Sequence, residues 1–303
     1  MSTPMSPSEP RLHHVTCSSA AGLHRTAYWE WGDPANPRVL VCVHGLSRQG
    51  RDFDTLARDL ASHYRVVCPD VVGRGRSGWL LDPRLYAVPT YVADMVTLVA
   101  RLNVPEVHWV GTSMGGLIGL ALAALKGTPI TRLVLNDVGP VIEPGFIPRI
   151  LGYLGVPVFW RTLEEAADAT WAISRGFGPH TREQWLELTR NQLVPAEQDD
   201  GHGRRVAGFK PHYDPAIAVP VRAATPEAAA AGEAVLWHLY DQILCPTLLL
   251  RGADSDLLSP ATAAAMAARG PRCQVHELPG VGHAPTLVAA DQRERVRRFL
   301  LGP

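Results

Sequence analysis

Short apolar segments alternate with segments of helical spacing along most of this 303-residue chain. Residues 39–45 (VLVCVHG) and 64–70 (YRVVCPD) have the composition of strands buried on both faces, and apolar residues recur at helical spacing between them. The alternation continues over 90–139 and returns over 245–302. Such strands, when separated by helices, form parallel sheets that are covered on both sides. We therefore expect an α/β fold with a mostly parallel central sheet and helices on both faces.

The N-terminal region has a different pattern. Residues 12–22 and 23–34 alternate apolar and polar side chains around a turn of small residues, which predicts an antiparallel hairpin at one edge of the sheet. Residues 1–14 are polar and rich in proline, and they lack the apolar stretch of a secretory signal. We expect them to form a flexible arm.

The alternation is interrupted for roughly 100 residues after Gly139, longer than an ordinary connection between elements. This stretch has helical pattern over 163–178, 181–193 and 228–243, with a Pro- and Gly-rich segment over 194–226. We expect residues 1–139 and 241–303 to form the core and residues 140–240 to form an inserted helical lid over the strand ends. The insertion holds four of the eight tryptophans, which we expect mainly to pack it against the core.

The composition excludes several classes of partner. Lys and Arg together number 29, as do Asp and Glu, so no net charge attracts the chain to nucleic acid or to an anionic membrane. No apolar run is long enough to span a bilayer. The five cysteines are odd in number and widely spaced, as in a protein with reduced thiols. We expect a cytoplasmic protein, monomeric or homodimeric, with no metal site and no cofactor.

A glycine-flanked serine lies between a predicted strand and a predicted helix. The segment Gly111-Thr112-Ser113-Met114-Gly115 fits the G-x-S-x-G pattern, which in this setting presents a serine on a tight turn. A serine hydroxyl is a poor nucleophile at neutral pH and needs a base, a group that orients the base, and donors for the oxyanion. The pattern alone leaves open whether Ser113 is a nucleophile or a small residue in a turn.

Chain order identifies a candidate base. In a sheet of this kind the acid and then the histidine follow the serine, and only His276 and His283 of the twelve histidines follow the late acidic loop. His276 lies within a predicted strand, whereas His283 lies in the glycine-flanked loop GVGHAP just past that strand. Catalytic groups of open α/β sheets gather in such loops, so His283 is the expected base.

The residues do not decide which aspartate is the acid, but they suggest the donors for the oxyanion. Asp254 and Asp256 follow the strand that ends at Gly252, and Asp137 ends the strand over 131–139. The backbone N–H groups of Met114 and Leu46 are the expected oxyanion donors, one after the serine and one after the first parallel strand. His44, beside that strand, is expected to hydrogen-bond its own loop and not to act as a second base.

Taken together, these segments resemble the α/β-hydrolase superfamily. The motifs HGLSRQGRDFDTLA, PDVVGRGRS, GTSMGG, GADSDLLSP and GVGHAP occur in the order typical of that fold, over nearly the whole chain. In the family the acid usually stands three residues after the strand-end glycine, a position that Ser255 occupies here. It also commonly precedes the proline of the next helix by four residues, which selects Asp256. We therefore expect Asp256 as the acid, then Asp254, and last Asp137.

The resemblance implies a serine hydrolase that cleaves a carboxylic ester or lactone through an acyl-enzyme intermediate. The chemistry of haloalkane dehalogenases and related epoxide hydrolases is not expected here, because those enzymes have aspartate where Ser113 stands. Carbon–carbon hydrolases of the meta-cleavage-product type usually have asparagine where Thr112 stands. They remain an alternative, as do a perhydrolase, an acyltransferase and a ligand receptor on the same fold. Candidate substrate contacts are Arg48 and Arg51, which could meet a carboxylate, and the aromatic residues Trp160 and Trp185.

Overall fold

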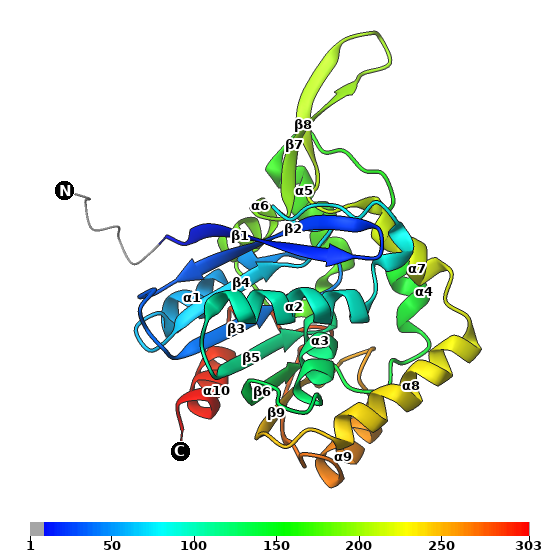
Figure 1. Ribbon diagram of the computed structural model, residues 1–303. Helices are drawn as coiled ribbons and strands as arrows, with labels where there is room; N and C mark the ends of the chain where they lie inside the picture. Colours follow the sequence, from blue (N-terminus) through cyan, green and yellow to red (C-terminus); the bar gives the residue numbers. More distant parts are fainter. Residues whose placement is uncertain (1–8, 303) are drawn as a thin grey trace, which may run out of the picture.

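The computed structural model describes residues 9–302, which are built around one eight-stranded sheet (Figure 1). The strands lie in the order β1-β2-β4-β3-β5-β6-β9-β10. Their bounds are β1 (Arg11–Ser19), β2 (Gly22–Trp31), β3 (Val39–Val43), β4 (Arg65–Asp70), β5 (Val107–Thr112), β6 (Ile130–Asn136), β9 (Thr247–Gly252) and β10 (Gln274–Leu278). From β4 to β10 the neighbouring strands are parallel, which confirms the predicted α/β fold.

The antiparallel hairpin predicted at the sheet edge is confirmed. β1 pairs with β2, and β2 pairs in turn with β4, both in antiparallel register. The arm predicted for residues 1–14 is wrong in its last part, because β1 begins at Arg11 and its backbone pairs with β2. The first eight residues lie outside the described part of the chain.

Helices cover both faces of the sheet, because the central strands bury their side chains on both faces. On one face lie α2 (Val88–Leu102), α3 (Met114–Ala123), α8 (Pro226–Asp241) and α9 (Pro260–Ala268), and on the other lie α1 (Asp54–Leu60) and α10 (Ala290–Leu301). Along β3, the side chains of Val39, Val41 and Val43 join the first core, and those of Leu40 and Cys42 join the second. Both cores are therefore built from period-two strands whose two faces are apolar.

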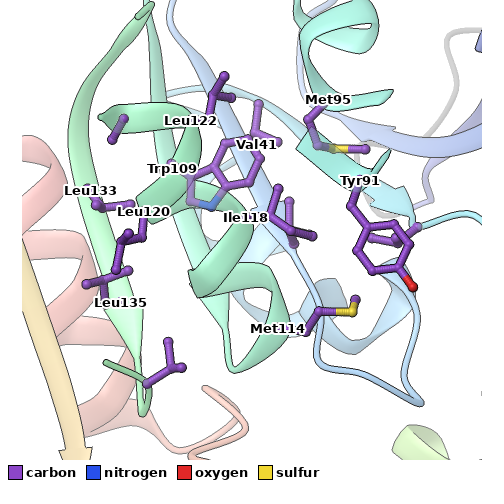
Figure 2. Close-up of a cluster of buried hydrophobic side chains, with 14 of the residues drawn as sticks. Val41, Tyr91, Met95, Trp109, Met114, Ile118, Leu120, Leu122, Leu133 and Leu135 are labelled. Atoms are coloured by element: carbon purple, nitrogen blue, oxygen red, sulfur yellow. The ribbon is translucent and has the colours of Figure 1, made fainter. Parts of the chain in front are cut away.

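The first core fixes helix α3, which begins immediately after Ser113. Ile118 and Leu122 of α3 are buried with Trp109 of β5, as Figure 2 shows. The indole Nε1 of Trp109 donates to the carbonyl oxygen of Gly115 at 3.1 Å. A Cβ at Gly119 would collide with the same indole, so glycine is needed for this close approach. The nucleophile candidate is thus attached to a rigid strand and a rigid helix.

The segment between β6 and β9 contains helices and an additional hairpin. Its helices are α4 (Phe146–Leu151), α5 (Leu163–Ile173), α6 (Arg182–Arg190), α7 (Ala218–Arg222) and α8, with short 3-10 turns at Arg175–Phe177 and Pro215–Ile217. β7 (Leu193–Asp199) and β8 (Arg205–Pro211) form an antiparallel pair that projects from the body of the molecule (Figure 1). This hairpin lies where the sequence predicted only a Pro- and Gly-rich segment of a helical lid, so the prediction missed it. α8, at the end of the insertion, packs on α3 in the core layer.

Two sequence expectations concern thiols and membranes. The five cysteines are unpaired, and four of them are buried. Within residues 9–302, no helix combines the length and the apolar character that crossing a bilayer requires.

Candidate active site

Ser113 lies on a strained turn between β5 and α3. Its φ of 53° and ψ of −118° are unusual for a residue with a side chain, and they are the conformation expected of a nucleophile presented at a sharp bend. Its backbone N–H donates to the carbonyl oxygen of Asn136 at 3.0 Å. A Cβ at Gly115 would collide with the carbonyl oxygen of Val43, so the second glycine of the pattern lets α3 start against the end of β3.

The structure brings Ser113, His283 and Asp137 into one hydrogen-bonded chain. The Nε2 atom of His283 lies 2.9 Å from the Ser113 hydroxyl, and its Nδ1 atom lies 2.8 Å from Oδ2 of Asp137. The Asp137 side chain is fully buried and that of His283 is 8% exposed. This is the geometry by which a carboxylate orients an imidazole so that it can take the proton of a serine hydroxyl.

The prediction of Asp256 as the acid is wrong. The exposed Asp256 side chain forms an ion pair with Arg149, with Nε to Oδ2 at 2.6 Å. Asp254, the second choice, is also exposed, and its backbone N–H donates to the carbonyl oxygen of Val281. Asp137, ranked last in the sequence analysis, contacts His283 because the ends of β6 and β9 lie side by side under the histidine loop.

Ser255, which stands at the family's usual acid position, hydrogen-bonds the Asp137 carboxylate. Its hydroxyl donates to Oδ2 of Asp137 at 2.7 Å, and the N–H of Gly252 donates to Oδ1 at 2.8 Å. With His283, three donors therefore surround a carboxylate that is shielded from water, as a buried charge requires. The departure at Ser255 was the sequence signal that pointed to a carboxylate at another strand end.

The loop that carries His283 is held from two sides. The ring of Phe146, at the start of α4, packs edge-on against the imidazole with centroids 4.8 Å apart. Asn136 donates through its amide nitrogen to the Pro285 carbonyl at 2.8 Å and to the Thr112 hydroxyl at 2.9 Å. Asn136 thus ties the histidine loop to the turn that presents Ser113.

The loop after β3 lies against the serine, as the predicted oxyanion site requires. A Cβ built on Gly45 would be 3.6 Å from the Cβ of Ser113. Leu46 follows directly, and Met114 is the first residue of α3, where backbone N–H groups lack partners within the helix. The donor roles of Leu46 and Met114 stay predictions that this arrangement supports.

A buried arginine connects the two residues predicted as oxyanion donors. Arg74 is fully buried, its Nε donates to the Leu46 carbonyl at 2.8 Å, and its Nη2 lies 3.7 Å from the sulfur of Met114. Its Nη1 donates to the Val72 carbonyl at 2.7 Å and to the Tyr91 hydroxyl at 3.0 Å. Arg74 was not singled out from the sequence, because its role depends on contacts between distant segments.

His44 is buried and hydrogen-bonds its own loop, as expected. Its Nδ1 lies 2.7 Å from the Gly45 carbonyl, and its Nε2 accepts from the N–H of Val71 at 2.9 Å. Burial lowers the pKa of His44 to about 3, so the imidazole stays neutral. A neutral His44 donates on one side and accepts on the other, and it thereby braces the loop behind Ser113.

A cavity of about 310 Å³ opens onto Ser113 and His283. Its walls are mostly apolar and come from the loop after β3 and from the insertion, including Leu46, Phe146, Ile150, Tyr153, Val156, Val158, Ile173 and Phe177. Of the four predicted substrate contacts, Arg48 and Trp160 line this cavity.

Arg51 and Trp185 do not line the cavity, so the prediction that they contact substrate is wrong. Arg51 binds the Asp54 carboxylate at 2.6 Å and stacks over Trp29. Trp185 is buried in a small aromatic cluster of the insertion, where its Nε1 donates to the Ala167 carbonyl at 2.8 Å. A largely buried ion pair satisfies Arg51, and local packing with a hydrogen bond satisfies Trp185.

One cluster of groups that can ligate a metal forms within residues 9–302, away from the serine. Cys17, His24 and Asp94 are buried together, with their ligand atoms within 4.8 Å of one another. His24 Nε2, however, lies 2.9 Å from both carboxylate oxygens of Asp94. Burial also raises the pKa of the Cys17 thiol to about 11, which disfavours the thiolate that binds metals. We interpret the cluster as a buried hydrogen-bonded pair beside a packed thiol.

Comparison with known proteins agrees with this geometry. The model of the alpha/beta hydrolase family matches residues 40–299. The chain is 56% identical to a 3-hydroxybutyrate-oligomer hydrolase of Cupriavidus necator over 293 residues, which cover 97% of this chain and 98% of that protein. It is also 24% identical to an esterase of Escherichia coli, over 88% of this chain and 94% of the other.

Solved structures show the same architecture. The crystal structure of an alpha/beta hydrolase from Novosphingobium aromaticivorans superposes with a TM-score of 0.80 at 36% identity, covering 96% of this chain and 98% of the other. The match extends over the sheet and the insertion alike, because the two chains align over nearly their whole lengths.

Proposed function

Because the chain belongs to the alpha/beta hydrolase family and is a carboxylic ester hydrolase, we propose that it hydrolyses the ester bonds of short 3-hydroxybutyrate oligomers with Ser113 as nucleophile. The observation that carries the substrate is the 56% identity to the Cupriavidus necator enzyme over nearly the full length of both chains. The hydrogen-bonded arrangement of Ser113, His283 and Asp137 supports the reaction class.

The proposed reaction has two steps. His283 takes the proton of Ser113 as the hydroxyl oxygen attacks the ester carbonyl, and the N–H groups of Leu46 and Met114 hold the oxyanion. The carbonyl–oxygen bond then breaks, and His283 gives the proton to the leaving alkoxide. A water molecule, deprotonated by the same imidazole, releases the acyl group and restores Ser113. Asp137 keeps the imidazole in the tautomer with Nδ1 protonated throughout.

The cavity supports a substrate of this chemistry. Its walls are largely apolar, which suits the methyl and methylene groups of each hydroxybutyrate unit. The insertion contributes much of this lining, and we propose that it acts as a cap over the strand ends. Thr112 remains the residue that separates this chain from the usual carbon–carbon hydrolases of the fold.

The test is a substrate panel on the wild-type protein and on Ser113→Ala. We expect many turnovers on the dimer and trimer of 3-hydroxybutyrate and on p-nitrophenyl butyrate, and at least about a thousandfold loss of kcat in Ser113→Ala. A vinylogous 1,5-diketone tests carbon–carbon hydrolysis, and lactones test ring opening. Adding an alcohol or hydrogen peroxide tests acyl transfer in place of hydrolysis.

The outcomes separate the alternatives. Cleavage of the diketone but not of the esters would identify a carbon–carbon hydrolase, and a single turnover would identify a ligand receptor. Turnover of p-nitrophenyl butyrate without any hydrolysis of the oligomers would keep the reaction class and contradict the proposed substrate.

A further inference from the structure

Two arginines line the cavity beside the triad. Among the described residues that line it, the permanently charged side chains are those of Arg48 and Arg149, and no Asp or Glu is present. A neutral ester needs no cation in an otherwise apolar pocket. An arginine in this place is suited to an anionic part of a ligand, and the surroundings of the two arginines determine which of them is available.

Arg48 already has an internal partner. Its Nε and Nη2 atoms bind the two carboxylate oxygens of Asp52 at 2.6 and 2.8 Å. The Asp52 carboxylate also accepts from the amide nitrogen of Gln192, in the insertion, at 2.6 Å. The side chains of Arg48 and Asp52 are 16% and 18% exposed, so this bidentate pair is largely withdrawn from water. Its charge is neutralised in place.

Arg149 also binds a carboxylate at two points, with Nε and Nη2 at 2.6 and 3.1 Å from the oxygens of Asp256, but this pair is exposed to water. Its carboxylate partner, Asp256, is 47% exposed, and Arg149 itself is 37% exposed. Exposed ion pairs of this kind contribute little to stability and are easily exchanged for another anion. Arg149 can therefore turn from Asp256 to a ligand carboxylate without breaking a buried interaction.

An aromatic ring places Arg149 on the histidine side of the cavity. The guanidinium carbon of Arg149 lies 4.8 Å from the centroid of the Phe146 ring, and that ring lies 4.8 Å from the centroid of the His283 imidazole. The distance from the guanidinium carbon of Arg149 to the centroid of the imidazole is thus at most twice 4.8 Å. Since His283 gives its proton to the leaving oxygen, a guanidinium within this distance of the imidazole can reach a charged group carried by the leaving unit.

We propose that Arg149 binds the terminal carboxylate of the oligomer, so that the protein removes one hydroxybutyrate unit at a time from the carboxyl end. This inference rests on the function proposed above and names the specificity determinant of that site. In a terminal unit only two carbons separate the leaving oxygen from the carboxylate carbon, a span of roughly 4 Å with bond lengths of about 1.5 Å. Adding a hydrogen bond of about 2.8 Å at each end bridges His283 and the guanidinium.

The reaction then has a defined direction. The bond between the carbonyl carbon and the oxygen of the last unit breaks, and the proton on His283 goes to that oxygen, which leaves as free 3-hydroxybutyrate. Water later supplies hydroxide to the acyl carbon on Ser113 and a proton to His283. The released acyl chain again ends in a carboxylate and can bind to Arg149 for the next cycle.

The experiment compares the 3-hydroxybutyrate dimer as the free acid with its methyl ester, in wild type, Arg149→Gln and Asp256→Asn. For Arg149→Gln we expect kcat/KM on the acid to fall about 10- to 100-fold, mainly through KM, with the methyl ester and p-nitrophenyl butyrate within about threefold of wild type. Asp256→Asn frees Arg149 from its competing carboxylate and should lower KM for the acid. A purely structural role for Arg149 would not separate acid from ester or give these opposite shifts.

Arg182→Gln is the matched control. Arg182 is another exposed arginine of the insertion, paired with Asp168 at 2.6 Å, and it does not line the cavity. We expect no change in its ratio of acid to ester hydrolysis. Because each protein is assayed on both substrates, the ratio reports on specificity even if a variant is less stable.

Three results would overturn the inference. An unchanged acid-to-ester ratio in Arg149→Gln, with wild type active on both dimers, would remove Arg149 as the specificity determinant. Loss of acid hydrolysis in Arg48→Gln alone would assign the carboxylate to Arg48. A wild type that cleaves p-nitrophenyl butyrate but neither dimer would instead reject the proposed substrate, and the inference with it.

Discussion

The loops after β6 and β9 lie side by side, the first with Asp137 and the second with Asp254 and Asp256, yet only Asp137 reaches the histidine. Asp137, after β6, is fully buried and accepts from His283, Ser255 and Gly252. Asp256, after β9, is half exposed and pairs with Arg149. A buried carboxylate needs several fixed donors, and those same donors hold it in one position, whereas an exposed carboxylate can exchange partners. This difference makes Asp137 suited to orienting a base and Asp256 suited to releasing Arg149.

The same contrast extends to the rest of the site. The floor beneath the serine consists of buried groups with internal partners, such as His44 and Arg74. The rim comes from the insertion and includes the exposed Arg149. We therefore expect changes to the floor to affect kcat or stability, and changes to the rim to affect which substrate binds.

The largest expected effect compares the two aspartates directly. In Asp137→Asn we expect kcat on p-nitrophenyl butyrate to fall about 10³- to 10⁴-fold, because the imidazole loses both its orientation and the stabilisation of its protonated form. In Asp256→Asn, on this substrate without a carboxylate, we expect kcat within about threefold of wild type. Steady-state kinetics, with Tm measured to confirm folding, check both values.

Opposite results would reverse the assignment. Full activity in Asp137→Asn, or a collapse of kcat in a folded Asp256→Asn, would place the acid on the loop after β9.

An intermediate effect is expected on moving the acid from one loop to the other. The hydroxyl of Ser255 is 2.7 Å from Oδ2 of Asp137, so a carboxylate at position 255 can approach the site that the Asp137 carboxylate leaves. We expect Asp137→Ala to be nearly inactive, and the double variant Asp137→Ala/Ser255→Asp to recover at least about tenfold in kcat. The control is Asp137→Ala/Ser255→Asn, which has a similar shape but no charge. Equal rates in the two double variants would show that position 255 cannot support the histidine.

The smallest effect concerns stability and pH. The pKa of His44 is about 3 in the folded protein, against an ordinary value of 6.5, so the unfolded chain binds the extra proton. The stabilisation of the folded protein by a neutral His44 is fully present above pH 6.5 and is lost as pH falls from 6.5 toward 3. From pH 7 to pH 5, this one group should lower the free energy of unfolding by about 1 to 2 kcal/mol.

Urea denaturation at several pH values measures this slope. His44→Gln keeps a donor and an acceptor without a titrating proton, and it should flatten the slope between pH 7 and pH 5. His276→Gln, on the partly exposed β10, is the comparison and should change the slope less. An unaltered slope in His44→Gln would mean that His44 does not stay neutral in the folded protein.

Local pattern was enough to predict much of this molecule. The alternation of apolar runs predicted the parallel sheet, and the position of His283 past a late strand predicted its contact with Ser113, which the structure confirms at 2.9 Å. Both predictions depend on short stretches whose spacing reports their own secondary structure. The hairpin β7–β8 was missed because the Pro- and Gly-rich residues around it mask the strand pattern.

The sequence by itself determined the turn at Ser113, because a strand, a glycine-flanked serine and a helix leave the chain one way to turn there, and chain order pointed to His283 as its partner. Only the tertiary structure decided which aspartate joins them. The sequence offers three carboxylates at two strand ends and ranked them in the wrong order, because burial and the donors of the neighbouring strand distinguish them. Tertiary packing likewise left Arg149 in an exposed ion pair with Asp256, while it paired Arg48 with Asp52 in a largely buried one. The partner of a charge is set by contacts between distant segments, which no local pattern records.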